Sequence, residues 1–232
     1  MTHQSTVRVF IGYDIQETIA YHVLVQSILE RATVPVSITP LVRAHLRSFY
    51  DRPRTEVEST DFSMTRFLVP KLCDYRGWAL FMDCDMLMRS DIADLWTMRD
   101  DRFSVMCIKH DHQPRTSTKF LGNIQTKYEM KNWSSVMLLN SDRCRMLTPE
   151  LVNQESGLFL HQFKWLPDRA EIGSLPSRWN YLVGESPPET DPALVHFTLG
   201  GPYFEEYANC EFAEEWRAVR ERLLRASPHP DA

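Results

Sequence analysis

The sequence predicts an α/β fold in which helices flank a mixed, mostly parallel central sheet. The chain begins with a β-rich run at 7–12, a helical pattern at 14–32 and a second β-rich run at 34–41. A strand–helix–strand start of this kind favours parallel pairing through a crossover helix. Further short apolar runs, which are typical of buried strands, follow at 78–82, 103–108, 135–140 and 193–197.

The helices are predicted from apolar spacing and from start signals. Asp14 and Glu17 form a D-x-x-E pattern that is typical of a helix N-terminus. A second helix is expected at 64–75, interrupted at Pro70, because proline cannot continue the hydrogen-bond ladder. The remaining predictions are a helical turn at 91–96, a helical stretch from Thr148 towards Trp165, an irregular segment at 171–182 and an amphipathic helix at 212–225.

Composition and charge exclude several classes of protein. The net charge of −5 argues against a basic surface for nucleic acid. The five cysteines are scattered without a C-x-x-C pair, as expected for reduced core residues in a cytoplasmic protein. The chain has no long apolar run and no basic leader before one, so we expect neither a membrane-spanning helix nor a signal peptide.

Two aspartates interrupt the apolar run ALFMDCDMLM at 79–88. Asp83 and Asp85 are two residues apart in extended chain and therefore point to the same side, with α-carbons roughly 6–7 Å apart. Ligands of open α/β sheets bind at this carboxyl end of the strands. Two carboxylates suit Mn²⁺ or Mg²⁺, and such an ion would bridge a diphosphate in place of the glycine-rich phosphate loops that the chain lacks. The alternative is that the aspartates cap a turn or pair with arginines.

Three stretches carry a family resemblance. TRFLVP followed by GWALFMDCDMLMRSDIADLW resembles the corresponding run of glycosyltransferases with the GT-A fold, especially family 8-like enzymes. IGYDIQETIAYHVLVQSI resembles their first strand and helix, and HFTLGGPYF resembles their C-terminal histidine motif. The middle of the chain looks like a bacterial subgroup of such proteins. The resemblance covers 7–30, 62–96 and 194–204.

The resemblance implies a metal-dependent transfer of a sugar from a nucleotide-sugar donor, most often a UDP-sugar, with retention of anomeric configuration. It implies that Asp83, Asp85 and His196 bind Mn²⁺ (or Mg²⁺). It implies that Gly12, Tyr13 and Asp14 line the base and ribose pocket, and that Arg66 contacts the donor from an exposed helix position. The acceptor is expected to be a glycan or a lipid-linked glycan.

The chain departs from the family 8 pattern in two places. Gly200 and Gly201 occupy the stretch where family 8 enzymes carry a phosphate-binding lysine, so they are expected to line the donor site. Lys131, at the end of the polar connection between 109 and 134, is the predicted replacement for that lysine. The usual Asp-Gln pair on the donor sugar is also not evident. His161 and Gln162 lie at about the right distance before RWN, and Asp168 is the nearest acid, so these three are the predicted catalytic residues.

The predicted organisation is one domain covering 1–232. Residues 7–108 form the nucleotide-binding half, residues 109–211 the acceptor and donor-sugar half, and residues 212–226 the C-terminal amphipathic helix. The apolar stripe of that helix is expected to pack on the body of the protein. The alternative is peripheral attachment to the inner face of an anionic membrane.

Other functions remain open from the sequence. A sugar nucleotidyltransferase is built on a similar sheet, but it is expected to carry a glycine-rich basic loop where this chain has GYDIQE. A phosphohydrolase is less favoured, because its D-x-D motif normally follows the first strand. A degenerate GT-A domain that binds a nucleotide sugar or a partner without turnover is the non-enzymatic alternative.

Overall fold

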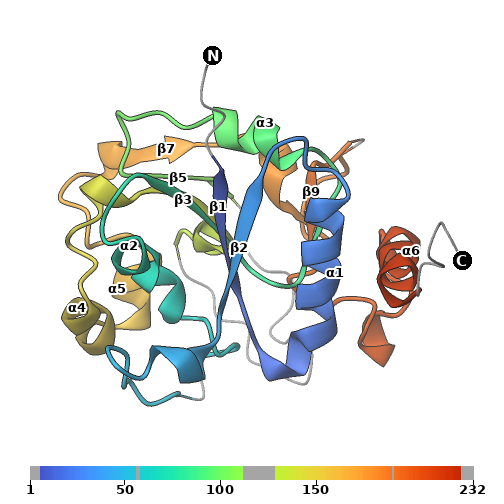
Figure 1. Ribbon diagram of the computed structural model, residues 1–232, viewed down its shortest axis with the longest axis horizontal. Coiled ribbons are helices and arrows are strands. Elements are labelled where there is room, and N and C mark those ends of the chain that lie inside the picture. The colour runs from blue at the N-terminus through green and yellow to red at the C-terminus, as the bar shows by residue number, and fades with distance from the viewer. Residues whose placement is uncertain (1–5, 56–57, 112–128, 190, 226–232) are drawn as a thin grey trace, which may run out of the picture.

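The computed structural model describes residues 6–55, 58–111, 129–189 and 191–225. Most of the polar connection predicted between 109 and 134 lies outside these ranges. The fold is α/β, with a mixed six-stranded sheet at its centre and helices on both sides (Figure 1). The fold class predicted from the sequence is therefore confirmed.

The central sheet has the strand order β2-β1-β3-β6-β5-β7. The strands β1, β2 and β3 are mutually parallel, β6 runs antiparallel to both of its neighbours, and β5 and β7 pair in parallel. Their bounds are β1 Val7–Gly12, β2 Val36–Leu41, β3 Trp78–Met82, β5 Val105–Cys107, β6 Val136–Asn140 and β7 Ile172–Ser174. The parallel strands β1 and β3 both end at the edge of the sheet where Asp14 and Asp83 follow.

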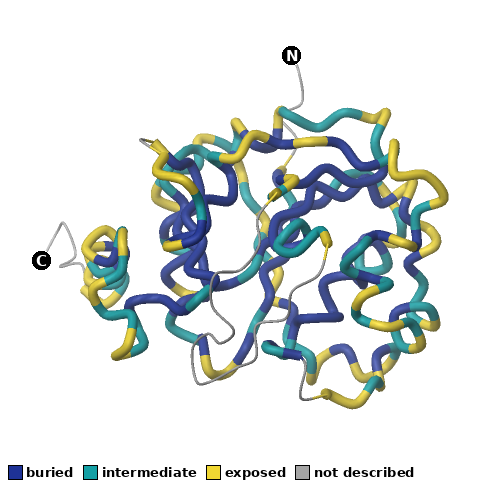
Figure 2. The backbone as a smooth tube through the Cα atoms, turned by 180° about the vertical axis from the view of Figure 1, so that it is seen from behind, coloured by how far each residue is buried: buried dark blue, intermediate teal, exposed yellow. Residues whose placement is uncertain are grey.

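The central strands are buried on both faces, which explains their continuous apolar sequences. All five residues of β6 are buried, as are the last four residues of β3. Figure 2 shows these strands as the buried centre of the molecule, with the exposed segments outside them. The edge strand β2 instead alternates between half-buried and exposed residues over its first four positions.

The helices lie where the sequence signals place them, but most are shorter than predicted. The main crossover helix α1 runs over Thr18–Leu29 after a one-turn helix at Ile15–Glu17. The predicted helix at 64–75 is a one-turn helix at Thr65–Leu68 followed by α2, Val69–Leu72, in which Pro70 occupies the first turn that proline tolerates. The other helices are α3 Ile92–Thr97, α4 Pro149–Gln154, α5 Gly157–His161 and α6 Ala213–Leu224.

A second, three-stranded sheet has the order β4-β9-β8. Its strands are β4 Met86–Met88, β8 Tyr181–Leu182 and β9 Leu194–His196. It shares an apolar cluster with α1 and α6, built on Val23, Val195 and Trp216. This sheet pairs β4, which directly follows the D-x-D motif, with β9.

The sequence prediction was wrong for the segment at 171–182. It was expected to be irregular, but it contains the strands β7 and β8. Strands of two or three residues show no apolar period that a sequence reading can detect. The strand β4 was also not predicted, and the helical stretch after Thr148 is two short helices, α4 and α5, separated by Glu155 and Ser156.

The C-terminal helix α6 packs on the body of the protein, as its apolar stripe predicted. Trp216 and Val219 are buried, and Arg222 forms an ion pair with Glu30 at the end of α1 at 2.7 Å. The stripe is therefore occupied by protein contacts, which gives no support to a membrane contact through this helix. Among the described residues, no helix is long and apolar enough to cross a membrane.

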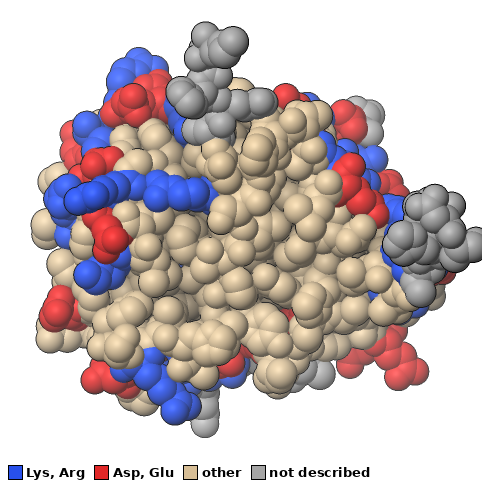
Figure 3. Space-filling model, viewed as in Figure 1, with Lys and Arg blue, Asp and Glu red and all other residues tan. Residues whose placement is uncertain are grey.

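The surface over β2, α1 and α2 carries few charged side chains. In Figure 3, lysine, arginine, aspartate and glutamate gather at the margin of this face and leave its centre largely uncharged. The segment 32–41, which includes β2, has no charged residue. This face therefore offers no basic patch of the kind that nucleic acid requires.

Candidate metal and nucleotide-sugar site

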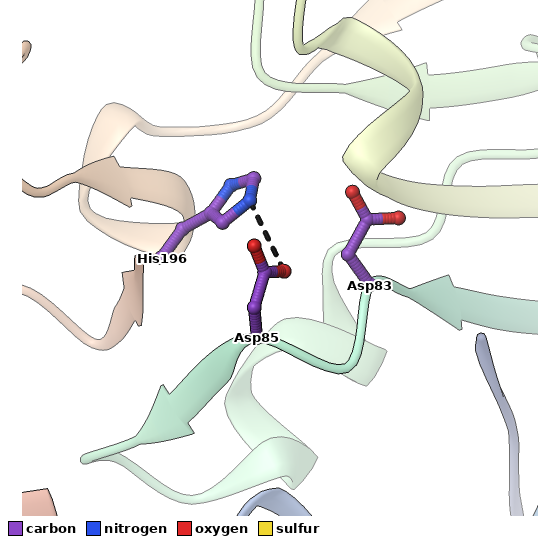
Figure 4. A group of neighbouring side chains, drawn as sticks. All are labelled: Asp83, Asp85 and His196. Atoms are coloured by element: carbon purple, nitrogen blue, oxygen red, sulfur yellow. Dashed lines mark ion pairs between the residues drawn. The ribbon is translucent and has the colours of Figure 1, made fainter. Parts of the chain in front are cut away.

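The D-x-D motif forms the turn between β3 and β4, two strands of different sheets. The backbone N–H of Asp83 donates to the carbonyl of Ser135 at 3.0 Å, and the carbonyl of Asp85 accepts from the N–H of Phe197 at 2.9 Å. These bonds fix both ends of the turn. The two carboxylates lie on the same side of it, at the carboxyl end of β3 (Figure 4).

His196 completes a cluster of three potential metal ligands. It is the last residue of β9 and pairs in register with Met86 of β4, so the antiparallel ladder brings it beside the D-x-D turn. One ligand atom from each of Asp83, Asp85 and His196 lies within 4.8 Å of the others. Two carboxylate oxygens and one imidazole nitrogen form a donor set that suits Mn²⁺. The residues present therefore fit a divalent ion.

Asn180 determines which nitrogen of His196 faces the cluster. The amide nitrogen of Asn180 donates to the carbonyl of Asn132 at 3.3 Å, which directs the amide oxygen of Asn180 to His196 Nδ1 at 2.8 Å. Since that oxygen can only accept, Nδ1 carries the proton. In neutral His196, Nε2 then presents a lone pair 3.3 Å from Asp85 Oδ1. Two acceptors at this distance require a proton or a cation between them.

Arg66 is buried and paired with Asp83, which corrects its expected position on an exposed helix face. Its guanidinium lies 2.8 Å from Asp83 Oδ1, and its side chain is only 7% exposed. It also donates to the carbonyls of Ser134 at 2.9 Å and Ser63 at 3.1 Å. Asp83 thus has a protein cation, whereas Asp85 faces His196. The side chain of Asp83 is 13% exposed.

His161 lies close enough to Arg66 to be affected by its charge, and it is not one of the three residues of the cluster. Its Nδ1 is 2.7 Å from Ser134 Oγ, and its ring packs edge-on against Phe67. Burial, together with the charge of Arg66, lowers the pKa of His161 to about 3. A histidine with this pKa is neutral near pH 7 and is a poor proton donor or acceptor there. This speaks against proton transfer by His161.

The other two predicted catalytic residues have local structural partners. Gln162 donates to the carbonyl of Glu129 at 3.5 Å. Asp168 is exposed, and its carboxylate accepts from the N–H of Ala170 at 2.8 Å, at the start of the turn before β7. Among the described residues, neither belongs to the three-ligand cluster.

The residues after β1 are placed by packing and capping. Asp14 is buried and uses both carboxylate oxygens, one for the N–H of Gln16 and one for the N–H of Asp61, each at 2.9 Å. Its predicted role as a helix cap is confirmed. A side chain at Gly12 would come within 2.3 Å of the Phe62 ring, so glycine lets that ring cover the end of β1.

Tyr13 lies directly after β1, and Lys131 lies in the segment that precedes β6. The hydroxyl of Tyr13 is 3.0 Å from Thr18 Oγ1. Lys131 lies between Met130 and Asn132, which both adopt left-handed backbone conformations, with φ of 63° and 64°. That turn leads directly to the residues that bind Arg66 and Asn180, so the polar connection ends at the site.

The Gly-Gly pair after β9 serves packing in the described structure. Gly200 has a φ of 143°, a region that other residues rarely adopt. A Cβ atom at Gly201 would lie 2.3 Å from the ring of Tyr203. The two glycines let the chain fold back so that Tyr203 covers Gly201. A contact between these glycines and a donor stays a prediction.

Sequence reasoning missed Asn180 and the turn at 130–135. Asn180 lies in the segment that was predicted to be irregular. The backbone carbonyls of Ser134 and Ser135 accept hydrogen bonds from Arg66 and Asp83, and backbone groups carry no side-chain signature. Only the RWN pattern around Asn180 could have indicated it.

The fold resembles solved glycosyltransferases. One is the bifunctional glycosyltransferase WbbM, with a TM-score of 0.64 and 12% identity over 95% of this chain, which spans 50% of that protein. Another is the galactosyltransferase LgtC in complex with donor and acceptor sugar analogues, with a TM-score of 0.61 and 12% identity over 95% of this chain and 98% of that one. The glycosyltransferase GlyE of Streptococcus pneumoniae TIGR4 has a TM-score of 0.60 and 13% identity over 96% of this chain and 61% of that one. The chain therefore has the GT-A glycosyltransferase fold.

The sequence defines the family more narrowly. The chain is 47% identical over 218 residues to Protein CDI of Arabidopsis thaliana, a match that covers 90% of this chain and 84% of that protein. The chain belongs to the Protein CDI family. No family model matches the chain.

Proposed function

We propose that the protein is a metal-dependent glycosyltransferase that moves a sugar from a nucleotide-sugar donor, most simply a UDP-sugar, to a glycan or lipid-linked acceptor. The observation that carries this proposal is the convergence of Asp83, Asp85 and His196 within 4.8 Å at the carboxyl edge of the sheet. Ligands of open α/β sheets bind at this edge. The likeness to solved glycosyltransferases supports the same class of reaction.

In this proposal Asp85 and His196 Nε2, with Asp83, hold a divalent ion. When bound, such an ion would stabilise the negative charge that develops on the diphosphate leaving group. Arg66 offsets the charge of Asp83 and fixes its carboxylate in position through their 2.8 Å contact. Asn180 holds the proton of neutral His196 on Nδ1 and so directs Nε2 at the ion. Lys131 is proposed to contact the diphosphate from the turn beside the site.

The donor is proposed to lie between the two halves predicted from the sequence, with its base and ribose near Gly12, Tyr13 and Asp14. The donor sugar would extend towards residues 109–211, where Gln162 and Asp168 are the proposed polar contacts. Retention of anomeric configuration is proposed because the sequence resembles family 8 enzymes. Transfer of the sugar to the acceptor, and not to water, requires the acceptor hydroxyl to be held against the donor sugar.

The test is a calorimetric titration of UDP into EDTA-treated protein, with and without added Mn²⁺. The proposal expects Mn²⁺ to strengthen UDP binding about tenfold or more, and the variant Asp85→Asn to lose that gain. Asp142→Asn is the matched control, because Asp142 accepts from Gly77 at the opposite end of β3. Equal affinity for UDP with and without Mn²⁺ in the wild-type protein would contradict the proposal.

Turnover is tested separately by UDP release from a panel of UDP-sugars with Mn²⁺ present. Release of UDP that depends on Asp85 supports an enzyme, and the anomeric configuration of the product, read by proton NMR, tests retention. Metal-dependent binding without any UDP release would indicate the non-enzymatic alternative, a domain that only binds nucleotide sugar. Release of pyrophosphate from a nucleoside triphosphate and a sugar phosphate would indicate a nucleotidyltransferase.

A further inference from the structure

Glu17 is a buried carboxylate that the proposed transfer does not use. It ends the one-turn helix before α1 and is only 1% exposed. Burying an ionised carboxylate is costly unless hydrogen-bond donors surround it. The groups that contact the Glu17 carboxylate therefore indicate its role.

One carboxylate oxygen of Glu17 binds the loop that follows His196. The hydroxyl of Tyr203 donates to Glu17 Oε1 at 2.7 Å. Burial of the phenol beside Glu17 and Asp85 raises the pKa of Tyr203 well above its usual range, so the hydroxyl stays a donor. The Tyr203 ring also packs against Trp216 of α6 at 5.4 Å.

The other oxygen of Glu17 supports the back of the D-x-D turn. The thiol of Cys84 lies 3.9 Å from Glu17 Oε2. Cys84 is fully buried, whereas the carboxylates of its neighbours Asp83 and Asp85 lie together on the ligand side (Figure 4).

We propose that Glu17 is a positioning residue of the metal site, because its two oxygens hold the two segments that supply the metal ligands. The D-x-D turn is held through Cys84 and the loop after His196 through Tyr203. The ladder between β4 and β9 aligns the backbones of these segments, whereas Glu17 fixes the turn and the loop beyond the ladder. This inference rests on the proposed function of the cluster.

The test measures Mn²⁺ affinity in the presence of UDP, by the loss of the free Mn²⁺ signal in electron paramagnetic resonance. Glu17→Gln keeps the size of the side chain and an acceptor for Tyr203 but removes the charge. Tyr203→Phe keeps the ring and removes the hydroxyl. Each variant is expected to weaken Mn²⁺ binding about tenfold, the lower end of the effect of residues that support metal ligands.

Tyr181→Phe is the matched control. Tyr181 donates to Glu211 at 2.9 Å, so the chain offers a second Tyr–Glu pair of similar geometry that does not involve Glu17. Both Tyr→Phe variants are expected to lower the thermal midpoint of the metal-free protein. Only Tyr203→Phe is expected to change Mn²⁺ affinity.

The possible failures are distinguishable. If the wild-type protein binds Mn²⁺ with UDP but Glu17→Gln and Tyr203→Phe bind it within twofold as well, the role of Glu17 is refuted while the proposed function stands. An equal loss of Mn²⁺ affinity in Tyr181→Phe and Tyr203→Phe also refutes it, because the effect is then one of general stability. If the wild-type protein binds no Mn²⁺, both proposals fail.

Discussion

Replacement of Arg66 by alanine tests how the D-x-D motif is held. Arg66 lies 2.8 Å from Asp83, and the two side chains are only 7% and 13% exposed. Removal of one partner of a buried ion pair leaves the other charge uncompensated, which costs about 3–5 kcal/mol. The loss of the hydrogen bonds to Ser63 and Ser134 is part of the same cost, because these contacts are not additive.

The control is Arg54→Ala. Arg54 pairs with Asp61 at 3.0 Å, but the two side chains are 38% and 30% exposed, so the pair is screened by solvent. Exposed pairs of this kind contribute at most about 1 kcal/mol. The two variants therefore compare the same chemistry at similar distance and different burial.

The assay is urea unfolding followed by tryptophan fluorescence, with and without Mn²⁺. In a thermal unfolding experiment the same loss of 3–5 kcal/mol would lower the midpoint temperature of a chain of this length by roughly 6–20 °C. Mn²⁺ is expected to restore more stability to Arg66→Ala than it adds to the wild-type protein, because the ion supplies the missing charge beside Asp83. If Arg66→Ala unfolds with the same free energy as Arg54→Ala, Arg66 is not the structural partner of Asp83.

Three further predictions follow from individual contacts. Asn180→Leu removes the acceptor for His196 Nδ1 and is expected to weaken the affinity for Mn²⁺ in the presence of UDP about 10–100-fold. Unchanged affinity in a titration would show that another group orients the imidazole. Because the pKa of His161 is lowered to about 3, the unfolded chain takes up a proton below about pH 6.5 that the folded protein excludes. The free energy of unfolding should then fall by up to about 1.4 kcal/mol per pH unit as the pH drops from about 6.5 to 5, and the slope should decrease in His161→Gln; parallel slopes in the two proteins would argue against a neutral buried imidazole. Gly201→Ala places a Cβ atom 2.3 Å from the Tyr203 ring. Overpacking of this kind costs about 1–3 kcal/mol of stability, which urea unfolding can measure. A stability equal to that of the wild-type protein would mean that the loop relaxes freely.

Much of the candidate site could be predicted from the sequence because its residues follow predictable strands. Asp83 and Asp85 interrupt an apolar run, and their spacing alone places both carboxylates on one side of the chain. His196 follows a late apolar strand within a motif that resembles the histidine motif of family 8 enzymes. The structure brings these three residues together as predicted.

The supporting contacts could not be predicted, because they join segments far apart in the chain. Arg66 was expected on an exposed helix face, yet its guanidinium binds Asp83 and the carbonyl of Ser134, 68 residues away. Asn180 reaches His196 from a segment without any apolar period. His161 was a predicted catalytic residue, but its low pKa follows from burial and from Arg66, and neither is visible in local sequence.

The sequence by itself determined the α/β class, the first crossover unit and the identity of the three potential metal ligands. The α/β class and the crossover unit follow from periodicity, and the placing of Asp83 and Asp85 on one side follows from their spacing, which are local properties of the chain. His196 was implied by the resemblance of HFTLGGPYF to the family 8 histidine motif. Only the tertiary structure decided the antiparallel direction of β6, the second sheet with its strands of two or three residues, and the pairing of Arg66 with Asp83. Each of these is stabilised by contacts between distant segments, and such contacts form only when the whole core packs, so no short stretch of sequence specifies them.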